Sequence, residues 1–290
     1  MITLARRVLP VCALAVALGV SAACTATDER GASRAPRPAP SASAASPFSP
    51  AAEPPTLAPG PAGLTPVFEH GPRNRGKAVA LTFDADMTAG QGARADGGER
   101  FDNPRLVATL RRLKVPATVF MTGRWAEEYP AQARSIGRDP LFEVANHSYS
   151  HYAFTDDCYG LPALPESRMR SDVERAYRAF RKVGVRDAMP YFRFPGGCHD
   201  RRALKALTQA GVTAVQWDVV SGDAFATDAG AVARQVLREV RSGSVVVMHC
   251  TLSAAPTTER AVRAIVPRLR ERGFRFVKVS DLIAAGAGRA

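Results

Sequence analysis

The sequence predicts an α/β protein in which a parallel sheet is built from strands joined by crossover helices. Two observations over residues 67–290 favour this fold class. Short apolar runs of strand length recur along the segment, and stretches with apolar residues at helical spacing lie between most of them. A repeated strand, helix, strand order is typical of a parallel sheet. Periodicity alone leaves two architectures open, a doubly wound sheet and a small, incomplete (β/α) barrel.

Seven apolar runs are the expected strands. The first covers 77–83 and reads KAVALTF, and the others cover 117–121, 142–145, 191–194, 214–219, 244–248 and 274–279. One expected helix begins at Asn103, and four others cover 171–183, 203–210, 229–240 and 259–271. The clearest of them, 171–183, carries apolar residues at helical spacing on one side only, so it is expected to cover a face of the sheet.

Composition and charge exclude several classes of protein. The chain has 290 residues, of which 46% are hydrophobic, which is too many for a wholly disordered protein. Its five cysteines are too few for a disulfide scaffold. The formal net charge is +12, but basic and aromatic residues do not alternate, so no nucleic-acid partner is expected. We expect the positive charge to hold the protein near an anionic cell envelope.

Residues 1–24 have the layout of an export signal peptide. Two arginines precede an apolar run over 8–20, and small residues over 21–23 follow it. The run is too short for a comfortable membrane span. Cys24 comes next, where a bacterial lipoprotein carries its lipid. Two outcomes stay open, a membrane-anchored lipoprotein and simple secretion after Ala23, and both place the protein on the cell-wall side.

Residues 25–66 are predicted to be a disordered linker. Ala, Ser and Pro dominate this segment, which holds ten of the 22 prolines and almost no large apolar residues. Such a composition cannot bury enough apolar surface to offset the entropy of ordering. The remaining residues, 67–290, are expected to form one catalytic domain and to act as a monomer.

Polar side chains follow the carboxyl ends of five expected strands. They are Asp84 and Asp86, then Asn146, His147 and His151, then Arg193 with Pro195, Gly196 and Gly197, then Asp223, and finally His249. The carboxyl ends of parallel strands meet at one edge of the sheet, where binding groups converge. The sequence therefore predicts one pocket at this edge.

Each of these residues taken alone also has a structural explanation. His147 and His151, at i and i+4, would face one metal ion if they lay on a helical turn, but they also suit a surface or capping position. Aspartate at the end of a strand commonly starts a turn. Arg193 suits packing among aromatic residues, and His249 suits a hydrogen-bonded core position. A shared site is favoured because all of them fall at the same edge.

The ordered segments TFDAD, NHSYSH, RFPGG, WDVVSGD and VVVMH resemble the five motifs of the polysaccharide deacetylases, carbohydrate esterase family 4, whose catalytic unit is the NodB homology domain. The resemblance runs from about Ala78 to Leu282, and NHSYSH is its most specific part. It implies a distorted (β/α) barrel of about seven parallel strands. It also implies metal-dependent removal of acetyl groups from a polysaccharide.

The resemblance assigns the metal and the general base. His147 and His151 would ligate a divalent ion, expected to be Zn²⁺, with Co²⁺ and Ni²⁺ as alternatives. Asp84 would take a proton from the attacking water, and Arg193 would pair with Asp84 and keep it ionised. Acetamide hydrolysis needs such an activated water together with an oxyanion stabiliser and an acid.

The resemblance also assigns the oxyanion and leaving-group functions. The backbone N–H of Gly196, where the family usually has Tyr or Phe, would donate to the oxyanion. His249 would protonate the leaving nitrogen, while Asp223 holds its other ring nitrogen and raises its pKa. The expected substrate contacts are Gly196, Pro195, Trp217 and Phe225.

Three positions depart from the family pattern. Ala85 replaces the usual second aspartate, a metal ligand, and Asp86 comes one residue later. Side chains two apart in a strand share a face, so either Asp86 completes the metal site or water joins the two histidines; we favour Asp86. Ala224 replaces a tryptophan that often follows Asp223, and Cys250 replaces a residue that is often Asp.

Three cysteines lie beyond Cys24, and an odd number leaves one unpaired. Cys158 follows the histidine motif and Cys198 follows the arginine motif, so both loops should lie over the pocket. A Cys158–Cys198 disulfide is therefore expected. Cys250 is expected to be a buried free thiol rather than a zinc ligand or a nucleophile.

The leading functional hypothesis is a hydrolase that removes acetyl groups from an N-acetylglucosamine polymer of the cell envelope, peptidoglycan or a chitin-like chain. A polysaccharide is thus the expected partner, with membrane contact only through lipid on Cys24. Two alternatives stay open. One is a catalytically impaired glycan-binding protein, motivated by Ala85. The other is a deacetylase of O-acetyl esters such as acetyl xylan.

Overall fold

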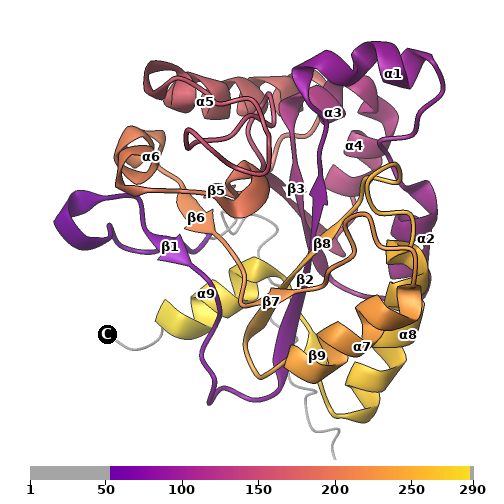
Figure 1. Cartoon of the computed structure of the whole chain (residues 1–290). Coiled ribbons are helices and arrows are strands. Elements are labelled where there is room, and N and C mark those ends of the chain that lie inside the picture. Colours follow the sequence, from indigo (N-terminus) through magenta and orange to yellow (C-terminus); the bar gives the residue numbers. More distant parts are fainter. Residues whose placement is uncertain (1–52, 288–290) are drawn as a thin grey trace, which may run out of the picture. The chain divides into compact units, whose positions relative to one another are not determined.

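The computed structural model of the protein describes residues 53–287. One parallel sheet forms its centre, with the strand order β1-β6-β5-β4-β3-β2-β8-β7 and with β9 beside β2 (Figure 1). The strands are β1 Val67–Phe68, β2 Ala78–Ala85, β3 Ala117–Met121, β4 Phe142–Asn146, β5 Tyr191–Phe192, β6 Thr213–Val215, β7 Val219–Val220, β8 Ser244–His249 and β9 Arg275–Phe276. The sheet curls as an incomplete barrel, because its two edge strands in the described part of the chain, β1 and β7, do not pair with each other. The predicted α/β class and distorted barrel are confirmed.

The helices connect the parallel strands. They are α1 Gly92–Asp96, α2 Pro104–Arg112, α3 Gly123–Glu128, α4 Pro130–Gly137, α5 Glu166–Lys182, α6 Arg201–Ala206, α7 Ala229–Glu239, α8 Thr258–Glu271 and α9 Val279–Ala287. Helices α7 and α8 lie side by side over β2 and β8, and α3 packs against α5 (Figure 1). Their apolar faces share one buried core with the outer face of the sheet.

Strand β2 lies at the centre of the sheet and presents a different surface on each side. Val79, Leu81 and Phe83 point outward into the core beneath the helices. Ala78 and Ala80 point inward into a second core that fills the barrel. Because side chains alternate along a strand, Asp84 shares the inner face and stands at its carboxyl end.

The structure differs from the expected elements in two respects. The expected strand over 214–219 is interrupted between β6 and β7, where main-chain carbonyls bond the buried Arg193 side chain: the Val215 carbonyl accepts from Nε and the Gln216 carbonyl accepts from Nη2. The short elements β1, α1, α3, α4 and α9 were not predicted, since nine residues or fewer give only a weak periodic signal; Val279, the last residue of the expected strand over 274–279, begins α9.

Part of the expected linker lies against the barrel. The Tyr191 hydroxyl donates to the Pro55 carbonyl at 2.7 Å, and Leu57 N–H donates to the Thr213 hydroxyl at 3.3 Å. The folded part therefore begins before residue 67, a correction to the expected boundary, because barrel side chains hold a segment that has few apolar residues of its own. The expected signal peptide with Cys24 and residues 25–52 of the expected linker lie outside the described residues. Within 53–287 no helix is both long and apolar enough to span a membrane.

Candidate active site

A buried ion pair joins two strands of the barrel. Arg193 Nη1 donates to Asp84 Oδ1 at 2.7 Å, and both side chains are almost wholly buried. Arg193 Nε also donates to the Val215 carbonyl at 3.2 Å, and its guanidinium lies over the Phe120 ring at 4.0 Å. A buried charge is tolerated when it is paired and hydrogen-bonded in this way. The pair leaves Asp84 Oδ2 as the oxygen not bonded to Arg193.

His147 is held in one tautomer beside Asp84. Its Nδ1 donates to the Arg193 carbonyl at 2.9 Å, and since a carbonyl oxygen only accepts, Nε2 carries the free lone pair. Nε2 lies 3.8 Å from Asp84 Oδ2. Burial, acting against the charges of Asp84 and Asp86, lowers the pKa of His147. His147 is therefore a neutral imidazole whose Nε2 lone pair is not used in a hydrogen bond, which is the form that binds a metal.

His151 reaches the same place from a loop. Its ring centroid lies 5.0 Å from that of His147, but residues 147–151 form no helical turn, and Ser148 and His151 have positive φ of 68° and 57°. Side chains replace the helical hydrogen bonds: Asn146 Oδ1 accepts from Ser148 N–H at 2.8 Å. The pair therefore converges through loop geometry, not through the helical face considered from the spacing. Burial lowers the pKa of His151 to about 4.

Asp172 of α5 supports this loop and was not predicted. Its Oδ2 accepts from Tyr149 N–H at 2.8 Å and from Ser150 N–H at 3.2 Å. A signal was present in the sequence, because Asp172 lies on the apolar face of its helix between Met169 and Val173. A charged residue on such a face needs a buried polar partner.

Asp86 lies beside His151. Its Oδ2 is 3.9 Å from His151 Nε2, while Oδ1 is hydrogen-bonded by the Thr251 hydroxyl. Burial would raise the pKa of Asp86, but the charges of His151 and His249 and the bond from Thr251 outweigh burial, so the pKa is lowered. Thr251 is a second supporting residue that the sequence pattern did not indicate.

The donors of His147, His151 and Asp86 suit a divalent metal in their chemistry. Two neutral imidazoles and one carboxylate are common zinc ligands, and Zn–N and Zn–O distances near 2.1 Å imply ligand atoms about 3.4 Å apart. The His151 to Asp86 separation of 3.9 Å is slightly wider. Among residues 53–287 no three such side chains are spaced closely enough to hold an ion.

His249 and Asp223 form a second pair, in which Asp223 is buried and His249 is partly exposed. His249 Nδ1 donates to Asp223 Oδ1 at 2.8 Å, and Asp223 Oδ2 accepts from the Thr258 hydroxyl at 2.6 Å and from His249 N–H at 2.8 Å. Burial lowers the pKa of His249, but the charge and hydrogen bond of Asp223 outweigh burial and raise it to about 10. At neutral pH His249 is therefore protonated, with Nε2–H free to donate.

Strand register brings the two pairs together. In the parallel pairing of β2 with β8, Asp84 is the direct partner of His249. On the other side of β2, strand β3 pairs with β4, and His147 directly follows β4. The Met121 carbonyl at the end of β3 accepts from His147 N–H at 2.8 Å. The edge thus gathers a carboxylate oxygen, neutral imidazoles and an imidazolium around one position, which is what amide hydrolysis requires.

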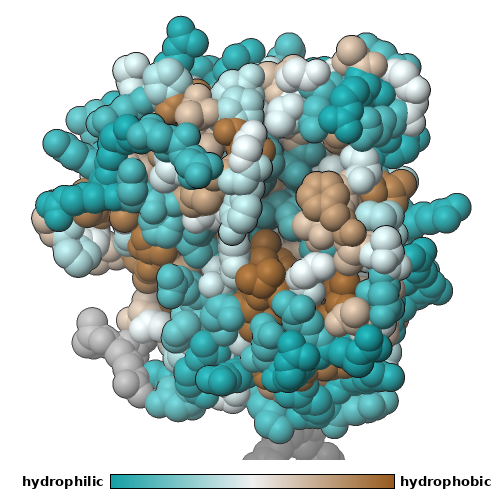
Figure 2. Space-filling view, viewed as in Figure 1, coloured by the Kyte–Doolittle hydropathy of each residue, from teal (hydrophilic) through white to brown (hydrophobic). Residues whose placement is uncertain are grey.

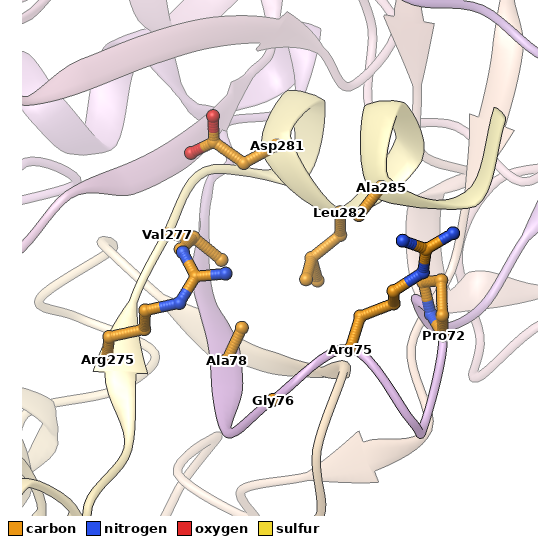
Figure 3. Close-up of a pocket in the computed structure, with 9 residues that line it drawn as sticks. All are labelled: Pro72, Arg75, Gly76, Ala78, Arg275, Val277, Asp281, Leu282 and Ala285. Atoms are coloured by element: carbon orange, nitrogen blue, oxygen red, sulfur yellow. The ribbon is translucent and has the colours of Figure 1, made fainter. Parts of the chain in front are cut away.

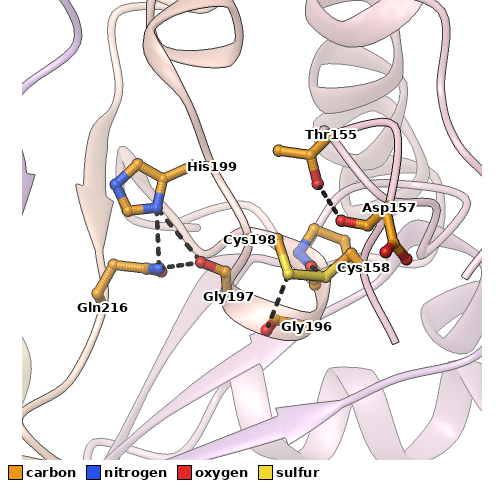
Figure 4. Close-up of a disulfide and its surroundings, with 9 residues drawn as sticks. Thr155, Asp157, Cys158, Gly196, Gly197, Cys198, His199 and Gln216 are labelled. Atoms are coloured by element: carbon orange, nitrogen blue, oxygen red, sulfur yellow. Dashed lines mark hydrogen bonds between the residues drawn. A yellow bond between two sulfur atoms is a disulfide. The ribbon is translucent and has the colours of Figure 1, made fainter. Parts of the chain in front are cut away.

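The loop after β5 is fixed by a disulfide. Cys158 and Cys198 are bonded, with Cα atoms 5.9 Å apart, and join the histidine loop to the loop that carries Gly196 (Figure 4). Gln216 Nε2 donates to the Gly197 carbonyl at 2.7 Å from the other side (Figure 4). Gly196 has φ of 65° and is exposed. Its N–H is thus held on a rigid loop beside Arg193.

The expected substrate contacts differ in exposure. Trp217 is partly buried against Gly197, where an added Cβ would lie 2.4 Å from its ring. Phe225 is 83% exposed with φ of 58°. Pro195 is buried, in contrast to Phe225 and to its exposed neighbour Gly196. Figure 2 shows a largely hydrophilic face with hydrophobic side chains gathered near β7, whose Val220 is half-exposed.

Cys250 is a buried thiol of the core. It has no disulfide partner within the described residues, and burial raises its pKa to about 12. A thiol with that pKa stays protonated and is a poor nucleophile at neutral pH.

A small pocket at the opposite end of β2 is separate from this site. Arg75, Arg275 and Asp281 lie around it, and its wall includes Ala78, the first residue of β2 (Figure 3). Asp84 is six residues further along the strand, which corresponds to about 20 Å. The pocket is therefore no part of the candidate active site.

The fold and the converging carboxylate and imidazole groups suit a hydrolytic α/β enzyme with its site at the carboxyl ends of barrel strands. Residues 71–215 match the family described as Polysaccharide deacetylase. The chain belongs to the polysaccharide deacetylase family, carbohydrate esterase family 4, and so to a class of hydrolases that act on amide bonds. The resemblance inferred from the five motifs is confirmed.

Relatives cover most of the chain. A peptidoglycan-N-acetylglucosamine deacetylase of Bacillus cereus is 26% identical over 212 residues, 72% of this chain and 90% of its own length. A chitooligosaccharide deacetylase of Sinorhizobium fredii is 30% identical over 210 residues, 68% of this chain and 87% of its own length. The structure of a family 4 pseudoenzyme from Bacillus anthracis has the same fold, with a TM-score of 0.61 and 23% identity, over 78% of this chain and 70% of that one.

Proposed function

We propose that the protein is a metal-dependent deacetylase that hydrolyses acetamido groups of an N-acetylglucosamine polymer of the cell envelope, peptidoglycan or a chitin-like chain. The observation that carries the proposal is the pairing of Asp84 with His249 across β2 and β8. Arg193 holds the first residue and Asp223 the second. The named activities of the Bacillus cereus and Sinorhizobium fredii relatives support the substrate class.

The proposed metal ligands are His147, His151 and Asp86. Zn²⁺ suits these donors, and Co²⁺ or Ni²⁺ would accept the same set. Such an ion, when bound, lowers the pKa of a water and polarises a carbonyl. The hydrogen bond from His147 Nδ1 to the Arg193 carbonyl leaves the lone pair of Nε2 free to bind a metal ion.

The protein groups carry the proton transfers. Asp84 accepts a proton from the attacking water, and the hydrogen bond from Arg193 holds the Asp84 carboxylate in place. As the water oxygen bonds to the acetyl carbon, the Gly196 N–H donates to the oxyanion. His249 Nε2–H then protonates the nitrogen as the C–N bond breaks, and acetate and a free amine leave. Asp223 stabilises the imidazolium until that step.

One observation favours the impaired, glycan-binding alternative. Ala85 stands where the family carries a ligand, and within 53–287 no three donor side chains are yet spaced for an ion. In that case the barrel would bind cell-wall glycans without cleaving them. An O-acetyl ester substrate such as acetyl xylan would use the same base and oxyanion donor, but would need less help from His249, because an alkoxide leaves more readily than an amide nitrogen.

We further propose an exported protein on the cell-wall side, monomeric and either secreted or anchored through lipid on Cys24. The signal-like residues 1–24 support export, and the net charge of +12 supports retention by anionic wall polymers. Retention on isolated cell walls should then weaken as salt is raised, and retention that ignores salt would contradict the electrostatic part.

Acetate release from N-acetylglucosamine oligomers tests the proposal. We expect release by the wild type, loss on chelation, recovery on adding Zn²⁺, and loss in His147→Ala and Asp84→Asn. Acetyl xylan, tested in parallel, separates the ester substrate from the amide. Stoichiometric metal and measurable glycan binding without acetate from any substrate would favour the binding alternative.

A further inference from the structure

Tyr159 is the most exposed large apolar side chain of the described residues, at 87%, and its backbone is strained. Its φ is 50°, and that of Gly160 is 73°. The Cys158 carbonyl accepts from Leu161 N–H at 2.9 Å, so Tyr159 and Gly160 are the central residues of a tight turn with positive φ at both positions. Such turns favour Gly, Asn and Asp at the place that Tyr159 occupies.

Strain of this kind gathers at the catalytic edge. Six non-glycine residues of the described chain have positive φ, and four of them lie on loops at this edge: Ser148, His151, Tyr159 and Phe225. Ser148 and His151 shape the histidine loop. Strained backbone clusters at active sites and ligand-binding loops, and the position of Tyr159 among these loops points to a role in binding.

The Tyr159 ring lies against the loop that carries the oxyanion donor. A Cβ built on Gly196 would lie 2.5 Å from Cys158 Sγ, 3.3 Å from Tyr159 Cδ2 and 3.4 Å from Leu161 Cδ1. The turn thus fills the space that a side chain at position 196 would enter. The adjacent disulfide to Cys198 fixes the turn on this loop (Figure 4).

We propose that Tyr159 is a substrate-contacting residue that stacks on a pyranose ring next to the sugar unit being deacetylated. This inference rests on the proposed function. A tyrosine ring offers a rigid apolar face at low entropic cost, and the C–H face of a pyranose is complementary to it. The hydroxyl rim of the sugar stays in water, as expected for a platform that is mostly exposed. Tyr159 therefore extends the site from one sugar unit to a chain.

Affinity for an oligosaccharide tests the inference independently of turnover. The probe is the N-acetylglucosamine tetramer, titrated calorimetrically into Asp84→Asn protein with and without Tyr159→Ala. We expect Tyr159→Ala to weaken binding by about tenfold, the size of one good aromatic contact. Tyr159→Phe is the matched control, because it keeps the ring, and its affinity should stay near that of the parent.

A second comparison separates substrate contact from a merely structural role. Tyr159→Gly removes the ring and relieves the positive φ, so the melting temperature should rise while tetramer affinity falls. In otherwise wild-type protein, Tyr159→Ala should raise KM for the tetramer far more than it lowers kcat. A ring that only stabilises the loop would instead lower the melting temperature and kcat when removed.

Failure of this inference is distinct from failure of the proposed function. Acetate release with unchanged tetramer affinity in Tyr159→Ala would overturn the role of Tyr159 and leave the deacetylase intact. Absence of acetate from every glycan would overturn the enzyme, whereas the calorimetric comparison would still show whether Tyr159 contacts sugar.

Discussion

Asp84 lies directly opposite His249 in the register of β2 and β8, and each is held by a partner from a different part of the barrel. Arg193 pairs with the Asp84 carboxylate, and Asp223 raises the pKa of His249 to about 10. A proposed base and a proton-carrying acid therefore meet at one edge of the sheet, as hydrolysis of an amide requires.

The His249–Asp223 pair predicts the alkaline limit of activity. The pKa of His249 in the folded protein is about 10, above its ordinary 6.5, so the acid stays protonated across the neutral range. We expect kcat/KM to fall as pH rises through about 10. In Asp223→Asn the fall should come at lower pH. An alkaline limit unchanged by Asp223→Asn would contradict this assignment.

The same pair makes a stability prediction. Because the folded-state pKa is raised, its stabilisation is fully present below about pH 6.5 and is lost as pH rises through about 10. The free energy of unfolding of the wild type should decline over that window more than that of Asp223→Asn. Chemical denaturation at a series of pH values measures both declines, and equal slopes would count against the pair.

Asp86 is predicted to complete the metal site in place of the family aspartate. Asp86→Ala should weaken Zn²⁺ binding by at least about tenfold, measured by competition with a coloured chelator. Thr251→Val, which removes only the hydroxyl that bonds Asp86, should have a smaller effect. Unchanged Zn²⁺ affinity in Asp86→Ala would mean that two histidines and water hold the ion.

Gly196 is predicted to be required for steric reasons that Gly160 does not share. Both have positive φ, but a Cβ at Gly196 would lie 2.5 Å from Cys158 Sγ, whereas one at Gly160 meets nothing within 4 Å. Gly160→Ala should lower the free energy of unfolding by about 1 kcal/mol through backbone strain, and Gly196→Ala should cost clearly more. Denaturant titration compares the two, and equal losses would contradict the crowding.

The Cys158–Cys198 disulfide is predicted to stabilise the domain. It closes a loop of 40 residues, so Cys158→Ser with Cys198→Ser should lower the free energy of unfolding by roughly 3–4 kcal/mol. A domain preparation that starts at residue 53 should show one reactive thiol, from Cys250, when it is denatured without reductant. Three reactive thiols would exclude the disulfide.

The convergence of the site could be predicted from sequence order, because parallel strands bring their carboxyl ends to one edge whatever their exact length. The loop path of His151 could not be predicted from spacing, since Asp172, far along the chain, supplies the hydrogen bonds that replace a helix. The contact of residues 55–66 with the barrel was not predicted, because the composition of a segment shows only how much apolar surface its own residues can bury. The hydrogen bonds that hold this segment come from Tyr191 and Thr213, which belong to the barrel.

The ratio of acetate to free amine released from an N-acetylglucosamine tetramer is the most direct test of the proposed hydrolysis. We expect one acetate and one amine per turnover for the zinc-loaded wild type, with the rate reduced at least about 100-fold in Asp84→Asn and in His249→Ala. Zinc-loaded wild type that binds the tetramer but releases neither product would contradict it.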